Sequence, residues 1–133
     1  MMKKSSGFTL IELIIVLVIL GVTVGLAAPN YFVTMERTRT NEAQTNLQAI
    51  YMGQKIYALN NSGNYWNPGA NPSVATINAT LNIDISPQFF PITSITANNF
   101  SNPKTFTVMA IRNTLQGGNG TTTFTVNQTG TVT

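Results

Sequence analysis

The residue best placed to do chemistry is Glu12, a carboxylate inside the otherwise apolar residues 8–28. A charged side chain at the centre of a bilayer costs about 2.5–3.5 kcal/mol, so its presence calls for an explanation. One explanation is that Glu12 lies near a helix N-terminus, where the helix dipole favours an anion. The other is a specific functional contact. We favour the second, because water-facing positions nearby would serve the dipole equally well.

The side chains that usually carry catalysis or hold a cofactor are missing. The 133-residue chain has no Cys and no His, which excludes disulfides, thiol catalysis and the commonest metal ligands. Glu36, Arg37, Arg39 and Glu42 have the spacing of weak ion pairs, and we expect them to form a solvated helical turn. Because no nucleophile is matched with a base, the sequence predicts neither an enzyme nor a bound metal or cofactor.

The charge is low and scattered. Charged residues make up 8% of the chain, against about 25% in a typical soluble domain. The 20 Thr and 16 Asn residues provide most of the polar surface instead. The net charge is +3, and the seven Lys and Arg residues do not cluster, so we predict no specific nucleic-acid site.

The apolar segment, residues 8–28, reads FTLIELIIVLVILGVTVGLAA. As a helix it is about 30 Å long, which matches one hydrocarbon core. Lys3 and Lys4 precede it, so the N-terminus should stay cytoplasmic and the rest of the chain should lie outside. Two kinds of processing fit: removal of the whole segment after Ala28, as in an ordinary signal peptide, or cleavage after Gly7 with the helix retained.

The residues around this junction resemble a known signal. Lys3-Lys4-Ser5-Ser6-Gly7 followed by Phe8-Thr9-Leu10-Ile11-Glu12 resembles the class III signal of type IV prepilins and type II secretion pseudopilins. The resemblance implies that residues 1–7 are a leader, that a prepilin peptidase cuts after Gly7, and that Phe8 is then N-methylated. It also implies that Glu12 pairs with the N-terminal amine of Phe8 in an adjacent subunit during assembly.

The resemblance also implies partners and a location. The subunit would be stored in the inner membrane as a single-pass protein, in contact with lipid. Assembly machinery in that membrane would then polymerise it, through its own apolar helices, into an extracellular filament. Its partners would therefore be copies of itself, the peptidase and the assembly machinery.

Three residues should weaken the helix towards the end of the apolar segment. Pro29 has no N–H, so the carbonyl of Gly25 loses its helical partner. Gly21 and Gly25 each destabilise a helix by about 0.8–1 kcal/mol relative to Ala. The helix should therefore be weakest between Gly21 and Pro29, and the resemblance implies that this stretch unravels during assembly.

Residues 29–59 predict a second half of the same helix with two apolar faces. One face carries Ala43, Leu47, Ile50, Tyr51, Tyr57 and Ala58, and nearly opposite lie Met52, Ile56 and Leu59. Two faces suggest that one packs on the chain's own domain and the other on neighbouring subunits. The alternative is a single core helix whose apolar stripe is spread around the wheel.

Residues 60–133 predict a loop and an antiparallel sheet. Residues 60–72 read as a loop anchored by Tyr65 and Trp66, and residues 74–85 fit either a short helix or an irregular turn. Alternation predicts strands at 88–96, 104–112 and 121–127, a hairpin loop at 113–120 and a turn at Gly130. The inward side chains should be Phe106, Val108, Ala110, Phe124 and Val126. The expected fold is α+β: a long N-terminal helix, its first half transmembrane, packed by a C-terminal antiparallel sheet as in pilins.

The sequence departs from the resembling family in two ways. It lacks the C-terminal disulfide of many type IV pilins. After Glu42 its only acidic residue is Asp84, too few for the calcium site of major pseudopilins. The expected function is a structural subunit of a type IV pilus-like filament. The alternatives are a minor pilin or pseudopilin of a short periplasmic fibre, and a membrane-anchored binding domain that does not polymerise.

Overall fold

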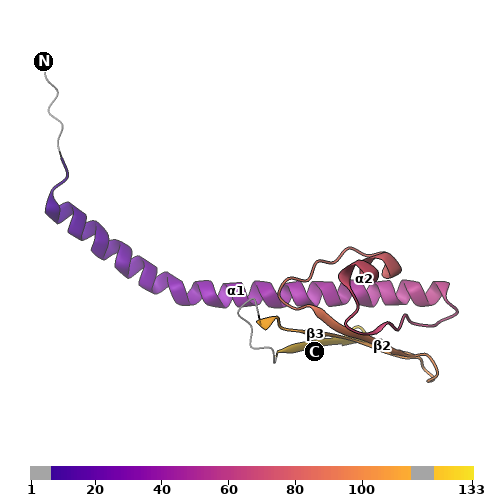
Figure 1. Ribbon diagram of the computed structural model, residues 1–133. Helices are drawn as coiled ribbons and strands as arrows, with labels where there is room; N and C mark the ends of the chain where they lie inside the picture. The colour runs from indigo at the N-terminus through magenta and orange to yellow at the C-terminus, as the bar shows by residue number, and fades with distance from the viewer. Residues whose placement is uncertain (1–6, 115–121) are drawn as a thin grey trace, which may run out of the picture. The chain divides into compact units, whose positions relative to one another are not determined.

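The computed structural model describes residues 7–114 and 122–133. The chain divides into two compact units, Met1–Arg37 and Thr38–Thr133. Helix α1 (Leu10–Asn60) contributes to both units and continues through Pro29 (Figure 1). All the other helices and strands among the described residues belong to the second unit.

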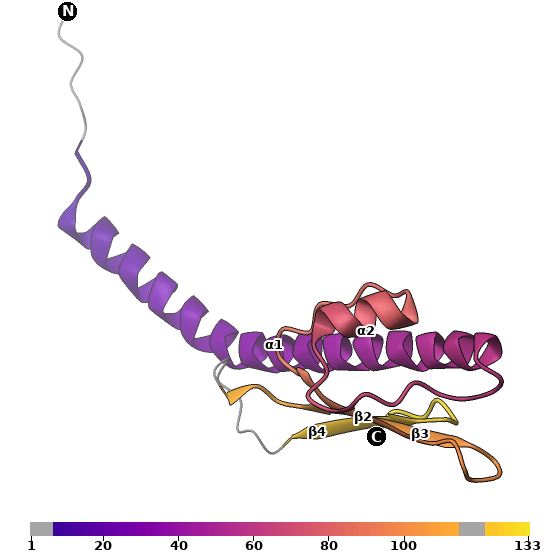
Figure 2. The same cartoon turned by 45° about the vertical axis from the view of Figure 1, so that its right-hand side comes forward.

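The second unit adds one helix and four strands to the end of α1. In chain order they are β1 (Gly69–Ala70), α2 (Val74–Leu81), β2 (Ile92–Asn98), β3 (Thr105–Ile111) and β4 (Thr123–Asn127). The strands form one antiparallel sheet in the order β1-β2-β3-β4. Figures 1 and 2 show α2 on one side of α1 and the sheet on the other.

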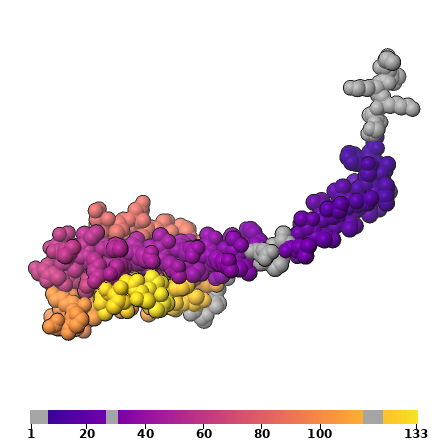
Figure 3. All heavy atoms as spheres, turned by 180° about the vertical axis from the view of Figure 1, so that it is seen from behind, coloured from indigo at the N-terminus to yellow at the C-terminus, as the bar shows by residue number. Residues whose placement is uncertain are grey.

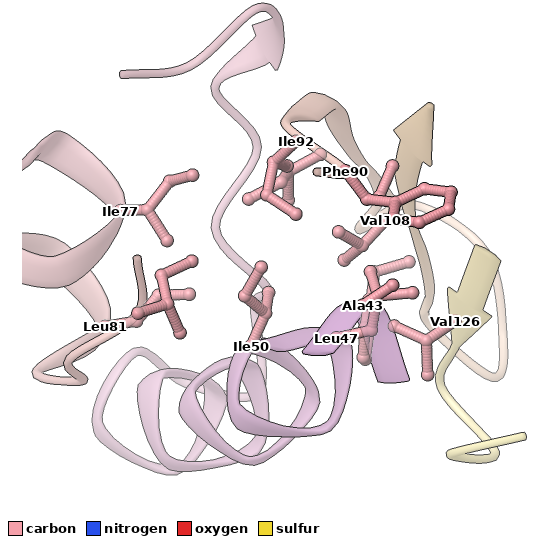
Figure 4. Close-up of a cluster of buried hydrophobic side chains, with 13 residues drawn as sticks. Ala43, Leu47, Ile50, Ile77, Leu81, Phe90, Ile92, Val108 and Val126 are labelled. Carbon is pink, nitrogen blue, oxygen red and sulfur yellow. The ribbon is translucent and has the colours of Figure 1, made fainter. Parts of the chain in front are cut away.

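The core of this unit lies between those layers. In Figure 4, Ile77 and Leu81 approach Ile50 from α2, while side chains of the sheet approach Leu47 and Ala43 from the other side. Ile95 pairs with Val108, and Val108 pairs with Val126, so all three point to the same buried face. The outward Thr96 and Thr107 are exposed, as expected for a sheet with one solvated face.

The α+β fold predicted from the sequence is confirmed, and so is the inward face of the helix. Ala43, Leu47 and Ile50 are at most 1% exposed. Met52, Ile56 and Leu59 are 60%, 55% and 84% exposed, so the helix does carry a second, uncovered apolar face within the part that the structure describes.

Two predictions concern the residues between α1 and β2: a helix or an irregular turn at 74–85, and a loop at 60–72. Residues 74–81 form a helix, with Ser73 Oγ accepting a hydrogen bond from Thr76 N and Asn82 ending it in the left-handed conformation. The predicted loop 60–72 contains the short strand β1, which pairs with β2.

The strand predicted at 88–96 begins later, at Ile92, and extends to Asn98. The first two residues of the predicted strand make hydrogen bonds with α1 instead of pairing in the sheet. The backbone N–H groups of Gln88 and Phe89 both donate to Glu42 Oε1 of α1. Arg39 also lies over the Phe89 ring, 4.8 Å from its centroid. The expectation that Arg39 and Glu42 belong to a purely solvated turn was therefore wrong.

The C-terminal strands agree with the predicted alternation. Phe106, Val108, Ala110 and Val126 are buried, and Phe124 packs half-buried against the core. β3 and β4 lie within the predicted bounds 104–112 and 121–127, whereas most of the predicted hairpin loop 113–120 lies outside the described residues.

The chain end returns to α1. Gly130 has φ +83°, its N–H donates to Asn127 O, and a Cβ there would come within 3.0 Å of the Tyr51 ring. Figure 3 shows this C-terminal segment, in yellow, against the second half of α1. The predicted turn at Gly130 is confirmed.

Candidate processing and assembly site

Glu12 and Thr9 cap the N-terminus of α1. Thr9 N and Thr9 Oγ1 both donate to Glu12 Oε2, at 2.9 Å and 2.8 Å. In return, Glu12 N donates to Thr9 Oγ1 at 3.3 Å. Because α1 begins at Leu10, Thr9 is the N-cap and Glu12 the third helical residue, which is the arrangement of a capping box.

Gly7 and Phe8 lie directly before this cap, outside the helix. Phe8 is 87% exposed. A Cβ built at Gly7 would meet no atom within 4 Å. The two residues form a shallow hollow of about 290 Å³ with Thr9 and Glu12. The structure therefore brings together the three residues Gly7, Phe8 and Glu12 that sequence reasoning assigned to processing and assembly. Of the proposed leader, residues 1–6 lie outside the described residues.

The helix that follows is apolar and uncovered. All the large hydrophobic side chains from Phe8 to Val33 are between 46% and 87% exposed. An 18-residue window of α1 has a mean hydropathy of 2.8, and among the described residues this is the one helix long and apolar enough to cross a membrane. Such a surface needs lipid or other protein around it.

Gly21 and Gly25 lie on this uncovered half of α1. A Cβ added at either glycine would meet nothing within 4 Å, so the backbone there is open to close approach. Thr23, between them, donates its hydroxyl to Ile19 O at 2.7 Å. The described backbone is helical from Gly21 through Pro29.

Sequence reasoning missed the role of Thr9, although its signal was present. The pattern Thr9-Leu10-Ile11-Glu12 has the S/T-x-x-E spacing of a capping box. Glu12 therefore does lie at the helix N-terminus, as the helix-dipole explanation requires. In addition, its carboxylate is held there by hydrogen bonds from Thr9.

Comparison with known proteins finds a family-model match in this same region. Residues 2–28 match the family model of the prokaryotic N-terminal methylation motif. The type IV major pilin protein PilA of Myxococcus xanthus is 44% identical over 54 residues, which is 41% of this chain and 24% of that protein. No solved structure is significantly similar to the chain.

Type II secretion proteins match over a similar length. The type II secretion system core protein G of Vibrio cholerae is 36% identical over 61 residues, 46% of this chain and 42% of that protein. The protein G of Klebsiella pneumoniae is also 36% identical over 61 residues, with 44% of its length covered. The matches thus span less than half of these relatives.

The methylation motif lies at the start of the apolar helix, and together they suggest a membrane-anchored protein. Over this part of its length the chain is similar both to a type IV major pilin and to type II secretion core proteins G, and it carries the N-terminal methylation motif at residues 2–28.

Proposed function

We propose that this chain is the subunit of a type IV pilus-like filament, processed between Gly7 and Phe8 and polymerised through α1. The observation that carries the proposal is the junction itself. An exposed, non-helical Gly7-Phe8 pair stands immediately before a capped helix whose apolar side chains are uncovered. A peptidase needs an accessible segment at the bond that it cuts, and a filament core needs an apolar surface to bury.

Before assembly the apolar half of α1 lies in the inner membrane, with Lys3 and Lys4 on the cytoplasmic side. Cleavage converts the amide nitrogen of Phe8 into an amine, and N-methylation leaves it protonatable. Processing therefore creates a cation next to Glu12. The amine of an incoming subunit and the Glu12 of its neighbour then form the contact that sets the axial register.

The exposed apolar face of α1 in the second unit supports polymerisation. Met52, Ile56 and Leu59 recur at helical spacing on the side away from the core. In a filament this face packs on neighbouring subunits. Weakening of the helix at Gly21, Gly25 and Pro29 lets the stretch between them adapt to its neighbours during assembly.

The test is intact-mass measurement of subunits from sheared surface filaments. The expected mass corresponds to a chain that starts at Phe8 and carries one methyl group. A chain that starts after Ala28, or an uncleaved chain in the filaments, would contradict the proposal.

A pseudopilin is the second candidate, favoured by the similarity to several type II secretion core proteins G. It predicts the same processing but short periplasmic fibres. Electron microscopy of shear fractions separates the two: long surface fibres support the pilin, and loss of secretion without surface fibres supports the pseudopilin.

A further inference from the structure

An open pocket of about 690 Å³ lies in the second unit where α1 ends. Its walls come from the last turn of α1, the loop at residues 60–67 and the end of β2 with the turn that follows it. We call it the helix-end pocket. Its volume lies within the range of small-molecule sites, about 300–1,000 Å³. Figures 1 and 2 show the loop after α1 and the β2–β3 connection at this same end of the unit.

Four aromatic residues line the helix-end pocket: Tyr57, Tyr65, Trp66 and Phe100. Tyr57 and Trp66 are half-buried, whereas Phe100 is completely exposed. The turn that carries Phe100 is ordered by Asn98, whose Oδ1 accepts the N–H groups of Phe100 and Ser101, each at 3.1 Å. A fixed turn that presents a large apolar ring to solvent leaves that ring available to a ligand.

The loop wall of the pocket is held in place by paired hydrogen bonds. The Asn99 amide binds both Tyr65 N and Tyr65 O, at 2.8 Å and 2.9 Å. The buried Gln54 amide does the same for the backbone of Trp66, at 2.9 Å and 3.0 Å. The pocket is therefore preformed, and a ligand would not have to order it.

Its polar lining is neutral. None of the described residues that line the pocket is charged. Two lysines contact lining residues, and both already have partners there: Lys104 donates to Asn64 Oδ1 at 2.7 Å and to Ser62 O at 3.3 Å, and Lys55 donates to the Tyr65 hydroxyl at 3.3 Å. Within residues 7–114 and 122–133, the Tyr57 hydroxyl, the Trp66 indole N–H and the Asn60 amide make no hydrogen bond. These groups can bind a ligand's hydroxyls but cannot neutralise a phosphate or carboxylate.

We propose that the helix-end pocket binds a neutral carbohydrate. A sugar ring has an apolar C–H face that stacks on an aromatic ring and an edge of hydroxyls that pair with amide, phenol and indole groups. That combination matches the aromatic rings and the uncharged donors that line this pocket. The inference goes beyond filament formation, because it gives the subunit a ligand of its own.

Trp66 is the only tryptophan of the chain, so its fluorescence reports on the pocket directly. The experiment titrates the full-length protein in lauryldimethylamine oxide, a detergent without a sugar head group. The probes are cellohexaose, chitohexaose, maltohexaose and laminarihexaose, with a dT12 oligonucleotide and a hexaglycine peptide alongside them. At least one hexasaccharide should change the Trp66 emission saturably, and the oligonucleotide and the peptide should not.

Phe100→Ala and Tyr57→Ala should each weaken that binding at least tenfold. Leu59→Ala, on the same turn of α1 but outside the pocket, should leave it unchanged. No saturable response to any hexasaccharide, or a response to the peptide or oligonucleotide instead, would overturn the proposal. Loss of filaments in Phe100→Ala would also overturn it, because the pocket would then be a contact between subunits. Filament formation by wild type is measured separately, so the failure of either proposal can be recognised.

Discussion

Glu12 has two possible uses, and its hydrogen bonds with Thr9 allow them to be separated. In a capping box the third helical residue can be Glu or Gln, because both side chains accept a hydrogen bond from the N-cap N–H. Only Glu carries a negative charge. A Gln at this position therefore keeps the cap and removes the partner of the Phe8 amine.

We predict that Glu12→Gln and Glu12→Ala both insert into the membrane, are both cut after Gly7, and both fail to form filaments as the sole subunit. Removing one member of a buried ion pair typically costs about 3–5 kcal/mol, chiefly through the charge left unpaired. Filament yield by immunoblot of the sheared fraction, against total processed subunit, measures the effect.

Glu36→Ala is the control for Glu12, because it removes a carboxylate from the same helix beyond the apolar segment; it should assemble normally. If Glu12→Gln assembles and Glu12→Ala does not, Glu12 acts through the helix cap. If both variants assemble, the pairing with Phe8 is wrong.

Gln54 has a structural role in the second unit that could not be predicted from the sequence. It is 0% exposed, and its amide satisfies both backbone groups of Trp66. Gln54→Leu would leave the N–H and C=O of Trp66 without these partners, and we expect the free energy of unfolding to fall by about 2 kcal/mol. Denaturant unfolding followed by Trp66 fluorescence measures it. Gln48→Leu, at an exposed position of the same helix, should change little, and an equal loss there would contradict the argument.

At the residue scale, the sequence identified a functional candidate only where one residue differs in kind from all of its neighbours. Glu12 stands out because everything around it is apolar. Gln54 and Glu42 do not stand out, because polar residues are common in that half of the helix. Their partners, Trp66 and the backbone at 88–89, are assigned only when the chain has folded.

At the scale of elements, periodicity predicted both faces of α1 correctly, but it said nothing of how closely α2 approaches. The approach depends on Gly53, which is buried where the end of α2 crosses α1. A Cβ at Gly53 would lie 2.8 Å from Leu81 Cβ and 3.2 Å from Ile83 Cγ2. Leu81 Cβ is fixed to the backbone of α2, so the helix itself would have to move.

We therefore expect Gly53→Ala to destabilise the second unit by about 1 kcal/mol. Overpacking of this kind costs about 1–3 kcal/mol, and it outweighs the gain in helix propensity of about 0.8–1 kcal/mol. The measurement is the midpoint of thermal unfolding by circular dichroism. Gly21→Ala, where no atom lies within 4 Å, is the matched control and should leave this transition unchanged. A stabilised Gly53→Ala variant would mean that the two helices are not in tight contact.

Strand boundaries were harder to predict than strand faces. Alternation correctly gave the buried side of β3, because a period of two needs only local sequence. The start of β2 depended on Glu42, 46 residues away from Gln88, which binds backbone amides that would otherwise be free for strand pairing. A contact at that separation leaves no local pattern.

At the scale of the whole molecule, the distribution of charge matters more than any one contact. From residue 60 to the C-terminus only Asp84, Lys104 and Arg112 are charged. The proposed removal of residues 1–7 would take away Lys3 and Lys4 and lower the formal side-chain charge from +3 to +1. A filament built from such subunits has little electrostatic repulsion to keep it apart from another filament.

The last prediction is that purified filaments bundle sideways, and that bundling depends only weakly on salt. Salt acts on charged surfaces by shortening the Debye length, from about 30 Å at 0.01 M to about 3 Å at 1 M, and a nearly uncharged surface gives it little to screen. Light scattering at 0.01 M and 0.5 M NaCl should differ by less than about twofold. The matched variant is Ala75→Lys with Thr107→Lys, which adds two charges at exposed positions of the second unit. Its filaments should separate at low salt and bundle at high salt, because they now repel one another. A steep salt dependence in the wild type would instead mean that charged groups of α1, such as Arg37 or Lys55, lie on the outer surface of the filament and govern its contacts.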